Sequence, residues 1–234
     1  MFTIGRNAMR KWEELPVSMQ NDEVKKYYDI LQRHRGSLVA KRILDIFVSG
    51  VLVVILAPVL LVLSVMIKID SPGPILFRQV RVTAYEKKFR IFKFRTMVNN
   101  ADKIGTQVTT KGDARVTRVG RLLRGCRLDE LPQLFNILRG DMTLVGTRPE
   151  VEKYVVHYTD EMKATLLLPA GVTSQASIHY KDEEKLLESA EDADRVYIET
   201  ILPEKMKYNL KEIENFNFWQ DIKTMFKTII AVIK

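Results

Sequence analysis

The sequence predicts a mainly helical α+β protein with a re-entrant membrane helix hairpin, a small antiparallel β element and amphipathic interfacial helices. Three observations predict this fold class: an uncharged apolar run at 46–67, two strand-like segments within 75–96, and helical spacing of apolar residues near both ends. The 234 residues then divide into three parts. We expect an N-terminal polar and amphipathic extension (1–40), a re-entrant membrane-anchoring helix (41–68) and a larger domain on one membrane face (69–234).

The two terminal segments carry the helical patterns. Residues 22–35 have apolar side chains at steps of three and four residues, which predicts an amphipathic surface helix; they are Val24, Tyr27, Tyr28 and Leu31. Residues 216–234 show the same spacing with lysines among the apolar residues. This second helix is expected either to lie in the membrane interface or to pack against the core.

The apolar run has 22 consecutive residues without a charge, from 46 to 67, which exceeds the roughly 18 that nominate a membrane helix. Pro58 lies near its midpoint. A proline inside a helix removes one backbone hydrogen bond and clashes with the preceding turn, so a bend is expected there. Each limb is then long enough to reach about half the hydrocarbon thickness.

Both flanks of the apolar run are basic. Arg33, Arg35, Lys41 and Arg42 precede it, and Lys68, Arg78, Arg81, Lys87 and Lys88 follow it. Because basic flanks favour the cytoplasm, a re-entrant hairpin satisfies both of them, whereas a simple crossing separates them. A proline-kinked spanning helix remains the alternative.

The next segment predicts a β hairpin. Residues 75–82 and 88–96 read as strands, joined by a turn through Tyr85-Glu86. Apolar and basic residues alternate over most of 89–95, so one face is expected to pack while the other presents cations. Further on, five arginines recur at every third residue, which winds them around a helix and suits contact with anionic headgroups: Arg115, Arg118, Arg121, Arg124 and Arg127.

The chemically most informative residues are the adjacent carboxylates Asp129 and Glu130. They precede Pro132, which marks a helix start, and both the helix dipole and the upstream arginines favour their ionised forms. An ionised carboxylate can act as a nucleophile, and two of them with phosphate oxygens suit Mg²⁺. The alternative to a catalytic role is that the two carboxylates only interact favourably with the helix dipole. Arg148, in a turn-prone segment, either grips a phosphate or is a plain surface residue.

Composition narrows the choice of partners. Lys and Arg total 37 against 29 Asp and Glu, a net charge of +8, which suits anionic lipid, phosphorylated substrates or nucleic acid. We expect no nucleic acid, because the basic residues coincide with the anchor and no recognition motif is present. The single cysteine, Cys126, excludes an intrachain disulfide and a cysteine-built zinc site, and the three histidines are scattered.

From Lys41 onward the chain resembles the bacterial sugar transferase family, the small monotopic phosphoglycosyl transferases. The order and spacing of the matching stretches are specific to this family. They are KRILD (41–45), the apolar run with Pro58, SPGPILFRQ (71–79), KFRTM (93–97), RVTRVGRLLR (115–124), LDELPQL (128–134) and GDMTLVGTRPE (140–150).

The resemblance implies a re-entrant helix broken at Pro58 and a covalent mechanism. In this family an aspartate attacks the β-phosphate of a UDP-sugar, UMP leaves with the help of Mg²⁺, and undecaprenyl phosphate removes the phosphosugar to initiate capsule, exopolysaccharide, O-antigen or glycoprotein assembly. Asp129 and Glu130 match the catalytic pair and are also the expected Mg²⁺ ligands. The domain 69–234 would then be catalytic and lie at the cytoplasmic face of the bacterial inner membrane.

Five basic residues are expected to bind the substrate phosphates: Lys93, Arg95, Arg124, Arg148 and Lys181. Lys93, Arg124 and Arg148 match basic positions of the family. The chain departs from the family where Thr147-Arg148-Pro149 stands for Pro-Arg-Pro, PAGVTS (169–174) for Pro-Gly-Ile-Thr-Gly, and SIHYK (177–181) for Asn-Gly-Arg. Lys181 is the candidate to replace the charge of that last arginine.

The expected partners are a UDP-sugar, undecaprenyl phosphate and membrane lipids, with a homo-oligomer left open. The competing interpretation is a catalytically inactive basic scaffold on the membrane surface. Such a scaffold would tolerate Asp129→Asn without loss of function.

Overall fold

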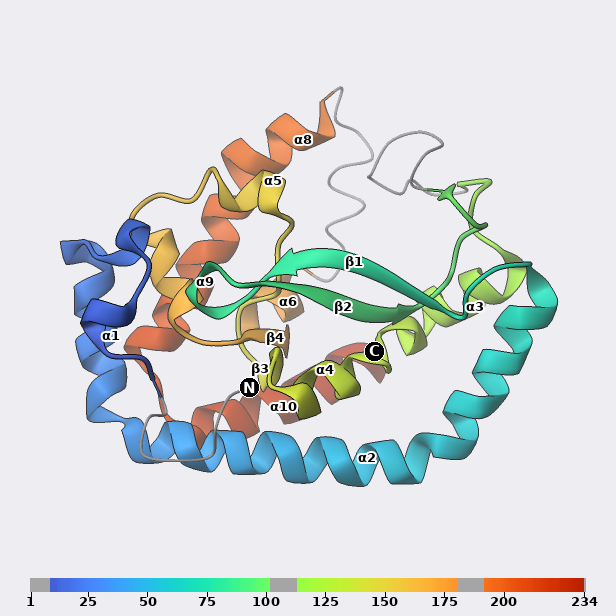
Figure 1. Ribbon diagram of the computed structural model, residues 1–234, viewed down its shortest axis with the longest axis horizontal. Helices are drawn as coiled ribbons and strands as arrows, with labels where there is room; N and C mark the ends of the chain where they lie inside the picture. Colours follow the sequence, from blue (N-terminus) through green and yellow to red (C-terminus); the bar gives the residue numbers. More distant parts are fainter. Residues whose placement is uncertain (1–8, 102–112, 181–191, 234) are drawn as a thin grey trace.

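The structure is a computed structural model that describes residues 9–101, 113–180 and 192–233. Helices surround two small sheets, and a long helix, α2 (Arg35–Asp70), runs along one side (Figure 1). The expected mainly helical α+β class with one antiparallel sheet and one long apolar helix is confirmed. The short helical elements are η1 (Trp12–Glu14), η2 (Val17–Met19), α5 (Glu152–Val155), η6 (Met162–Leu167), α6 (Gln175–His179), α8 (Ala193–Val196) and a π-helical turn, Tyr197–Ile201.

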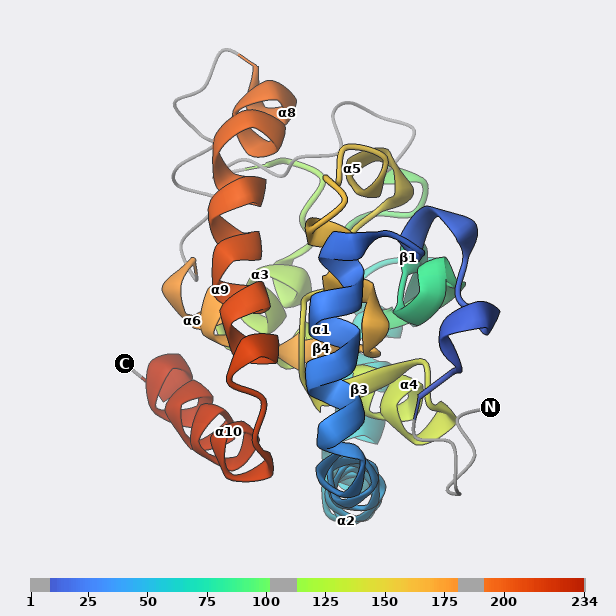
Figure 2. The same cartoon turned by 90° about the vertical axis from the view of Figure 1, so that its left-hand side faces the viewer.

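Helix α1 (Asp22–Arg33) forms where its spacing predicts it. The side chain of Asn21 caps its first turn by accepting a hydrogen bond from Val24 N at 2.9 Å. Its four predicted apolar residues are all buried. They join the largest hydrophobic cluster among the described residues, where α1 lies against η6 and beside α9 (Leu202–Glu214; Figure 2). Residues 9–33 are thus built into the core of the domain that follows.

Helix α2 contains the whole apolar run and has Pro58 in its interior. Figure 1 shows it running along the lower edge of the molecule and then turning upward, without a break in the helix. Only 11% of its most apolar 18-residue window is buried. A core helix of a soluble domain is mostly covered, so this exposure supports membrane association.

The beginning of α2 is tied to the domain by buried polar contacts. Lys41 Nζ donates to Val145 O at 2.7 Å and pairs with Asp221 Oδ2 at 2.6 Å. One turn later, Asp45 accepts a hydrogen bond from Thr143 Oγ1 at 2.6 Å. Because buried charges are stable only when they are paired, these contacts fix the helix on the domain.

The end of α2 is tied to the same domain. Asp70 Oδ2 accepts a hydrogen bond from Val119 N at 3.0 Å. The guanidinium of Arg95, whose residue is only 5% exposed, donates to Pro72 O at 2.8 Å and to Ser71 O at 2.6 Å. These bonds satisfy carbonyl groups just beyond the helix end.

The predicted hairpin is present. Strands β1 (Leu76–Val82) and β2 (Lys88–Phe94) pair antiparallel, with Leu76 opposite Phe94 and Val82 opposite Lys88. The 3-10 turn η3 (Ala84–Glu86) connects them, and Tyr85 adopts a left-handed φ of 58° within it. Phe89 and Ile91 pack against α2 and against α4 (Gln133–Arg139), as the alternating pattern predicts for one face.

A second, parallel sheet was not predicted. It consists of β3 (Met142–Val145) and β4 (Ala170–Thr173). Two four-residue strands far apart in sequence leave no periodic signal, so only the tertiary fold reveals their pairing. A Cβ on Gly171 would lie 2.2 Å from Gly146 N, so glycine permits the close approach of the chains here.

The C-terminal helix α10 (Phe218–Ile233) follows its predicted range. It contacts α2, and the two helices lie together at the lower edge of Figure 2. Apolar side chains of α10 are left exposed, namely Trp219, Phe226, Ile229 and Ile230. Among the described residues this helix therefore both packs on the domain and presents an apolar face.

Candidate active site

Asp129 and Glu130 lie on a 3-10 turn, η5 (Leu128–Glu130), between α3 (Arg118–Gly125) and α4. Pro132 occupies the N-cap position of α4, so the carboxylates precede a helix start as the sequence predicts. Arg127, just before the turn, has a left-handed φ of 54°, which reverses the chain after α3.

Two cations converge on one carboxylate oxygen of this turn. Glu130 Oε1 lies 2.7 Å from Lys93 Nζ and 2.8 Å from Arg148 Nη2. Glu130 and Lys93 are the more buried side chains, whereas Arg148 is 35% exposed. Burial alone would raise the pKa of Glu130, but Arg148 and Lys93 outweigh it and hold this pKa well below its usual range. Glu130 is therefore ionised across the physiological pH range.

Asp129 behaves differently from its neighbour. Burial raises its pKa above the ordinary value, and the positive charges of Lys93 and Arg124 oppose that rise only in part. The expectation that the surroundings favour ionisation of both carboxylates is thus wrong for Asp129. The reason is geometric, because the direct cation contacts go to Glu130.

Arg124 lies in the last turn of α3, close to this turn. Its Nε donates to Thr96 Oγ1 at 3.1 Å. Gly120 allows this approach, since a Cβ there would lie 2.0 Å from Thr96 O. Only three of the five periodic arginines lie in α3, whereas Arg115 pairs with Asp113 ahead of the helix.

Arg95 is not brought to this cluster. Its guanidinium donates to carbonyl oxygens just after α2, whereas the sequence predicted that it binds a substrate phosphate. Lys93, two residues earlier and still within β2, points to Glu130 instead, whereas Arg95 lies beyond the end of the strand at Phe94. Lys181 lies outside the described residues.

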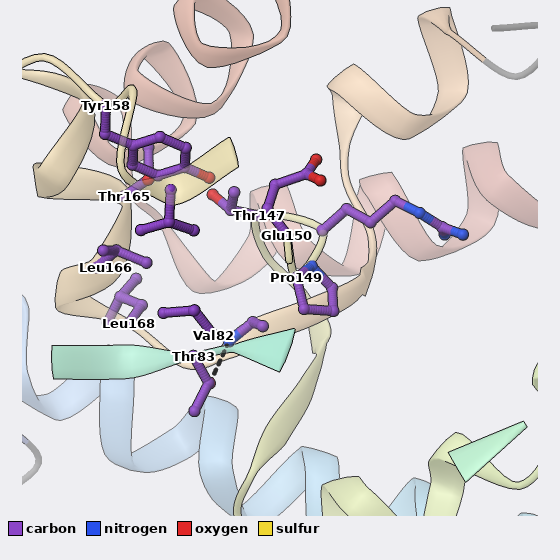
Figure 3. Close-up of a pocket in the computed structure, with 12 residues that line it drawn as sticks. Val82, Thr83, Thr147, Pro149, Glu150, Tyr158, Thr165, Leu166 and Leu168 are labelled. Atoms are coloured by element: carbon purple, nitrogen blue, oxygen red, sulfur yellow. Dashed lines mark hydrogen bonds between the residues drawn. The ribbon is translucent and has the colours of Figure 1, made fainter. Parts of the chain in front are cut away.

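Arg148 reaches Glu130 from an irregular segment after β3. Gly146 N donates to Thr173 O at 2.8 Å, which holds the beginning of this segment on β4. Figure 3 shows Thr147, Pro149 and Glu150 beside a small pocket, with Tyr158, Thr165, Leu166 and Leu168 on its other side. In that view the Glu150 carboxylate points away from Leu166 and Leu168.

Glu150 belongs to a buried ionic group that sequence reasoning missed. The other members are Arg81, Tyr197 and Lys205. Together with Glu150 they come from three separate parts of the chain, since Tyr197 and Lys205 lie in one helical stretch, so no local spacing predicts the whole group. The only local signal is Glu150 itself, an acidic residue directly after the Arg148-Pro149 pair.

The oxygen atoms at this site decide whether a metal ion could bind there. The described residues contain no group of three or more His, Cys, Asp or Glu side chains placed to hold one. Asp129 and Glu130 supply two carboxylates, and the contacts of Lys93 and Arg148 use only Oε1 of Glu130. Mg²⁺ is commonly bound by one or two carboxylates together with substrate phosphates and water, so these residues fit it.

Fold and site together define a membrane-associated domain whose paired carboxylates are surrounded by cations, an arrangement suited to phosphate chemistry. The chain belongs to the bacterial sugar transferase family, whose model matches residues 36–234. The resemblance seen in the sequence motifs is thereby confirmed.

Curated relatives agree on the kind of transferase. The chain is 37% identical to the UDP-N-acetylgalactosamine-undecaprenyl-phosphate N-acetylgalactosaminephosphotransferase of Aeromonas hydrophila, with 82% of the chain and 43% of that protein covered. It is 36% and 35% identical to the UDP-glucose:undecaprenyl-phosphate glucose-1-phosphate transferases of Klebsiella pneumoniae and Caulobacter vibrioides, each over 82% of the chain. The matches cover 40% and 69% of those two proteins, so the chain spans less than half of two of the three relatives.

Proposed function

We propose that the protein transfers a phosphosugar from a UDP-sugar to undecaprenyl phosphate through a covalent intermediate on Asp129, and so initiates assembly of a bacterial glycan. The observation that carries this proposal is the convergence of Lys93 and Arg148 on Glu130, next to Asp129. Cations gathered at a carboxylate pair are suited to a diphosphate substrate. The names of the relatives give the substrate class.

The first half-reaction uses Asp129 as the nucleophile. Its carboxylate oxygen attacks the β-phosphorus of the UDP-sugar, a new P–O bond forms, and the bond to the α-phosphate oxygen breaks to release UMP. Lys93, Arg124 and Arg148 neutralise the phosphate oxygens that would otherwise repel the incoming anion. Asp129 attacks in its ionised form, which burial disfavours by raising its pKa and which the positive charges of Lys93 and Arg124 favour.

The second half-reaction returns Asp129 to its starting state. A phosphate oxygen of undecaprenyl phosphate attacks the same phosphorus, the bond to Asp129 breaks, and the polyprenyl diphosphate sugar leaves. Glu130 orients Lys93 and Arg148 in both halves, since its Oε1 contacts both of them. Mg²⁺, held by Asp129, Glu130 and the substrate phosphates, would supply further neutralisation of the diphosphate charge.

The attachment of α2 supports a re-entrant arrangement with its bend at Pro58. Both ends of the apolar helix are hydrogen-bonded to one domain, through Asp45 at the beginning and Asp70 at the end. A straight crossing would separate the two ends by about 30 Å, the thickness of the hydrocarbon layer. With both basic flanks on one side, the domain lies at the cytoplasmic face of the inner membrane. The apolar face of α10 then rests in the interface.

The test is a turnover assay on the purified, detergent-solubilised protein. Undecaprenyl phosphate and Mg²⁺ are supplied with a panel of UDP-sugars that includes UDP-glucose and UDP-N-acetylgalactosamine, and UMP release is measured for each. We expect release with at least one sugar and none from Asp129→Asn. Absence of UMP with every sugar, from protein that stays folded and membrane-bound, would favour the inactive scaffold.

A further inference from the structure

The contact between Arg148 and Glu130 depends on a short irregular segment. Residues 147–150 belong to no helix or strand. A guanidinium must lie within a few tenths of an ångström of its place to bind a phosphate bidentately, so the position of this backbone decides whether Arg148 is effective.

The segment is held by hydrogen bonds on both sides of Arg148. The three contacts are Gly171 N to Thr147 O (2.8 Å), Arg81 Nη1 to Pro149 O (3.2 Å) and Val82 N to Glu150 O (2.9 Å). The backbone of Arg148 is therefore fixed between β4 and the end of β1. Two of the three bonds lie on its C-terminal side, at Pro149 and Glu150.

The side chain of Glu150 adds a buried ionic anchor at this end. Only 6% of it is exposed. Tyr197 donates its hydroxyl to Glu150 Oε1 at 2.5 Å, and Lys205 Nζ lies 3.5 Å from the same oxygen and donates to Tyr197 at 3.0 Å. Arg81 Nη1 lies 3.9 Å from Glu150 Oε2. The anchor thus joins the segment to β1 and to the helices around Tyr197 and Lys205.

The charges of this anchor also affect Arg148. Burial lowers the pKa of Arg81, Glu150 opposes that change, and Arg148 adds to it, so the two arginines repel each other. The negative charge of Glu150 partly compensates Arg81. Without the Glu150 charge, Arg81 and Lys205 would each lose a buried anionic partner.

We propose that Glu150 is a positioning residue, which acts through Arg148 by holding its segment on Arg81, Tyr197 and Lys205 and thereby sets the Arg148 guanidinium at the phosphate site. Glu150 itself touches no reacting atom. The reaction in which this matters is that of the proposed function.

A double-mutant cycle of Glu150→Gln and Arg148→Ala tests the proposal. Glutamine keeps the shape of the side chain and an oxygen for Tyr197 but removes the charge. We expect Glu150→Gln to raise KM for the UDP-sugar and to lower kcat/KM by about tenfold per folded molecule. In the Arg148→Ala background the same change should have less than about a twofold effect, because residues that act as one unit are not additive.

Two tyrosine variants provide a matched control. Tyr197→Phe removes the hydroxyl bonded to Glu150, and Tyr27→Phe removes an equivalent hydroxyl that donates to Glu161 Oε1 at 2.7 Å. We expect a rise in KM from Tyr197→Phe alone, even where both variants lose similar thermal stability. Equal KM values for the two would assign Glu150 a purely structural role and overturn the proposal.

Measuring the affinity for inorganic pyrophosphate across the same double-mutant cycle separates this inference from the proposed function. Pyrophosphate binding needs no turnover, and we expect it to depend on Arg148. A wild-type protein without UMP release would overturn the function alone. Additive losses of pyrophosphate affinity in the cycle would overturn the positioning role, whether or not the protein turns over.

Discussion

Lys93 places its ammonium group 2.7 Å from Oε1 of Glu130, and this ion pair joins β2 to the turn between α3 and α4. As a result, the two adjacent carboxylates differ in their tendency to ionise. Glu130 is bound by cations and is held ionised, whereas the pKa of Asp129 is raised by burial. Environments that push the pKa values of neighbouring groups apart are typical of sites with distinct catalytic roles.

The covalent mechanism predicts that UMP appears before any acceptor is added. Wild-type protein given a UDP-sugar without undecaprenyl phosphate should release at most one equivalent of UMP and gain one phosphosugar on the peptide containing Asp129. Asp129→Asn should lose both signals, and Glu130→Gln should slow both. Mass spectrometry and UMP quantification measure them. An adduct on another residue would show that Asp129 is not the nucleophile and would leave it the role of a metal ligand.

Arginines near the site should differ in their effects. Arg148→Ala removes a direct partner of Glu130 and should lower turnover by more than tenfold, about 1.4 kcal/mol or more of transition-state stabilisation. Arg118 is exposed at the start of α3, so Arg118→Ala should reduce vesicle binding with little change in turnover. Steady-state kinetics and vesicle flotation separate the two, and equal losses of turnover would contradict the distinction.

Arg95 should behave as a structural residue. Arg95→Met keeps the apolar stem of the side chain but leaves Pro72 O and Ser71 O without their donor, so the free energy of unfolding should fall by about 2 kcal/mol or more. KM for the UDP-sugar should stay within about twofold of wild type in the folded fraction. A large rise in KM without loss of stability would indicate that Arg95 binds the substrate phosphates after all.

The re-entrant topology predicts equal accessibility of both flanks of α2. Cys126 is exposed and is first replaced by serine. Single cysteines at the exposed positions Arg35 and Arg78 should then react alike with an impermeant thiol reagent in intact cells. Opposite reactivities would establish a spanning helix. Pro58→Ala should shift some molecules towards that state, because 22 uninterrupted apolar residues can cross.

Glu212 should make stability depend on pH. Burial raises its pKa to about 7 from the ordinary 4.5. Protonation therefore favours the folded state, and this contribution is complete below about pH 4.5 and is lost as the pH rises through 7. Glu212→Gln keeps an acceptor for Gln175 N. It should be more stable than wild type at pH 8, by up to about 3 kcal/mol, and not at pH 5. Thermal denaturation at both pH values checks this, and a pH-independent difference would refute it.

The sequence by itself determined the elements with a strong local signal. The apolar run gives α2, and alternation around Tyr85-Glu86 gives the hairpin to within two residues at each outer end. Pro132 after two carboxylates places Asp129 and Glu130 at the start of α4. These features depend on neighbouring residues, whose periodicity is readable in one dimension.

Only the tertiary structure decided which residues meet. Lys93 and Arg95 are two residues apart on the chain, yet one binds Glu130 and the other the end of α2. The parallel pairing of β3 with β4, the packing of residues 9–33 into the core, and the anchor at Glu150 likewise join distant segments. Burial, which also raises the pKa of Asp129, depends on the whole fold. Contacts and dielectric surroundings arise from three-dimensional packing, and a local sequence pattern carries no record of them.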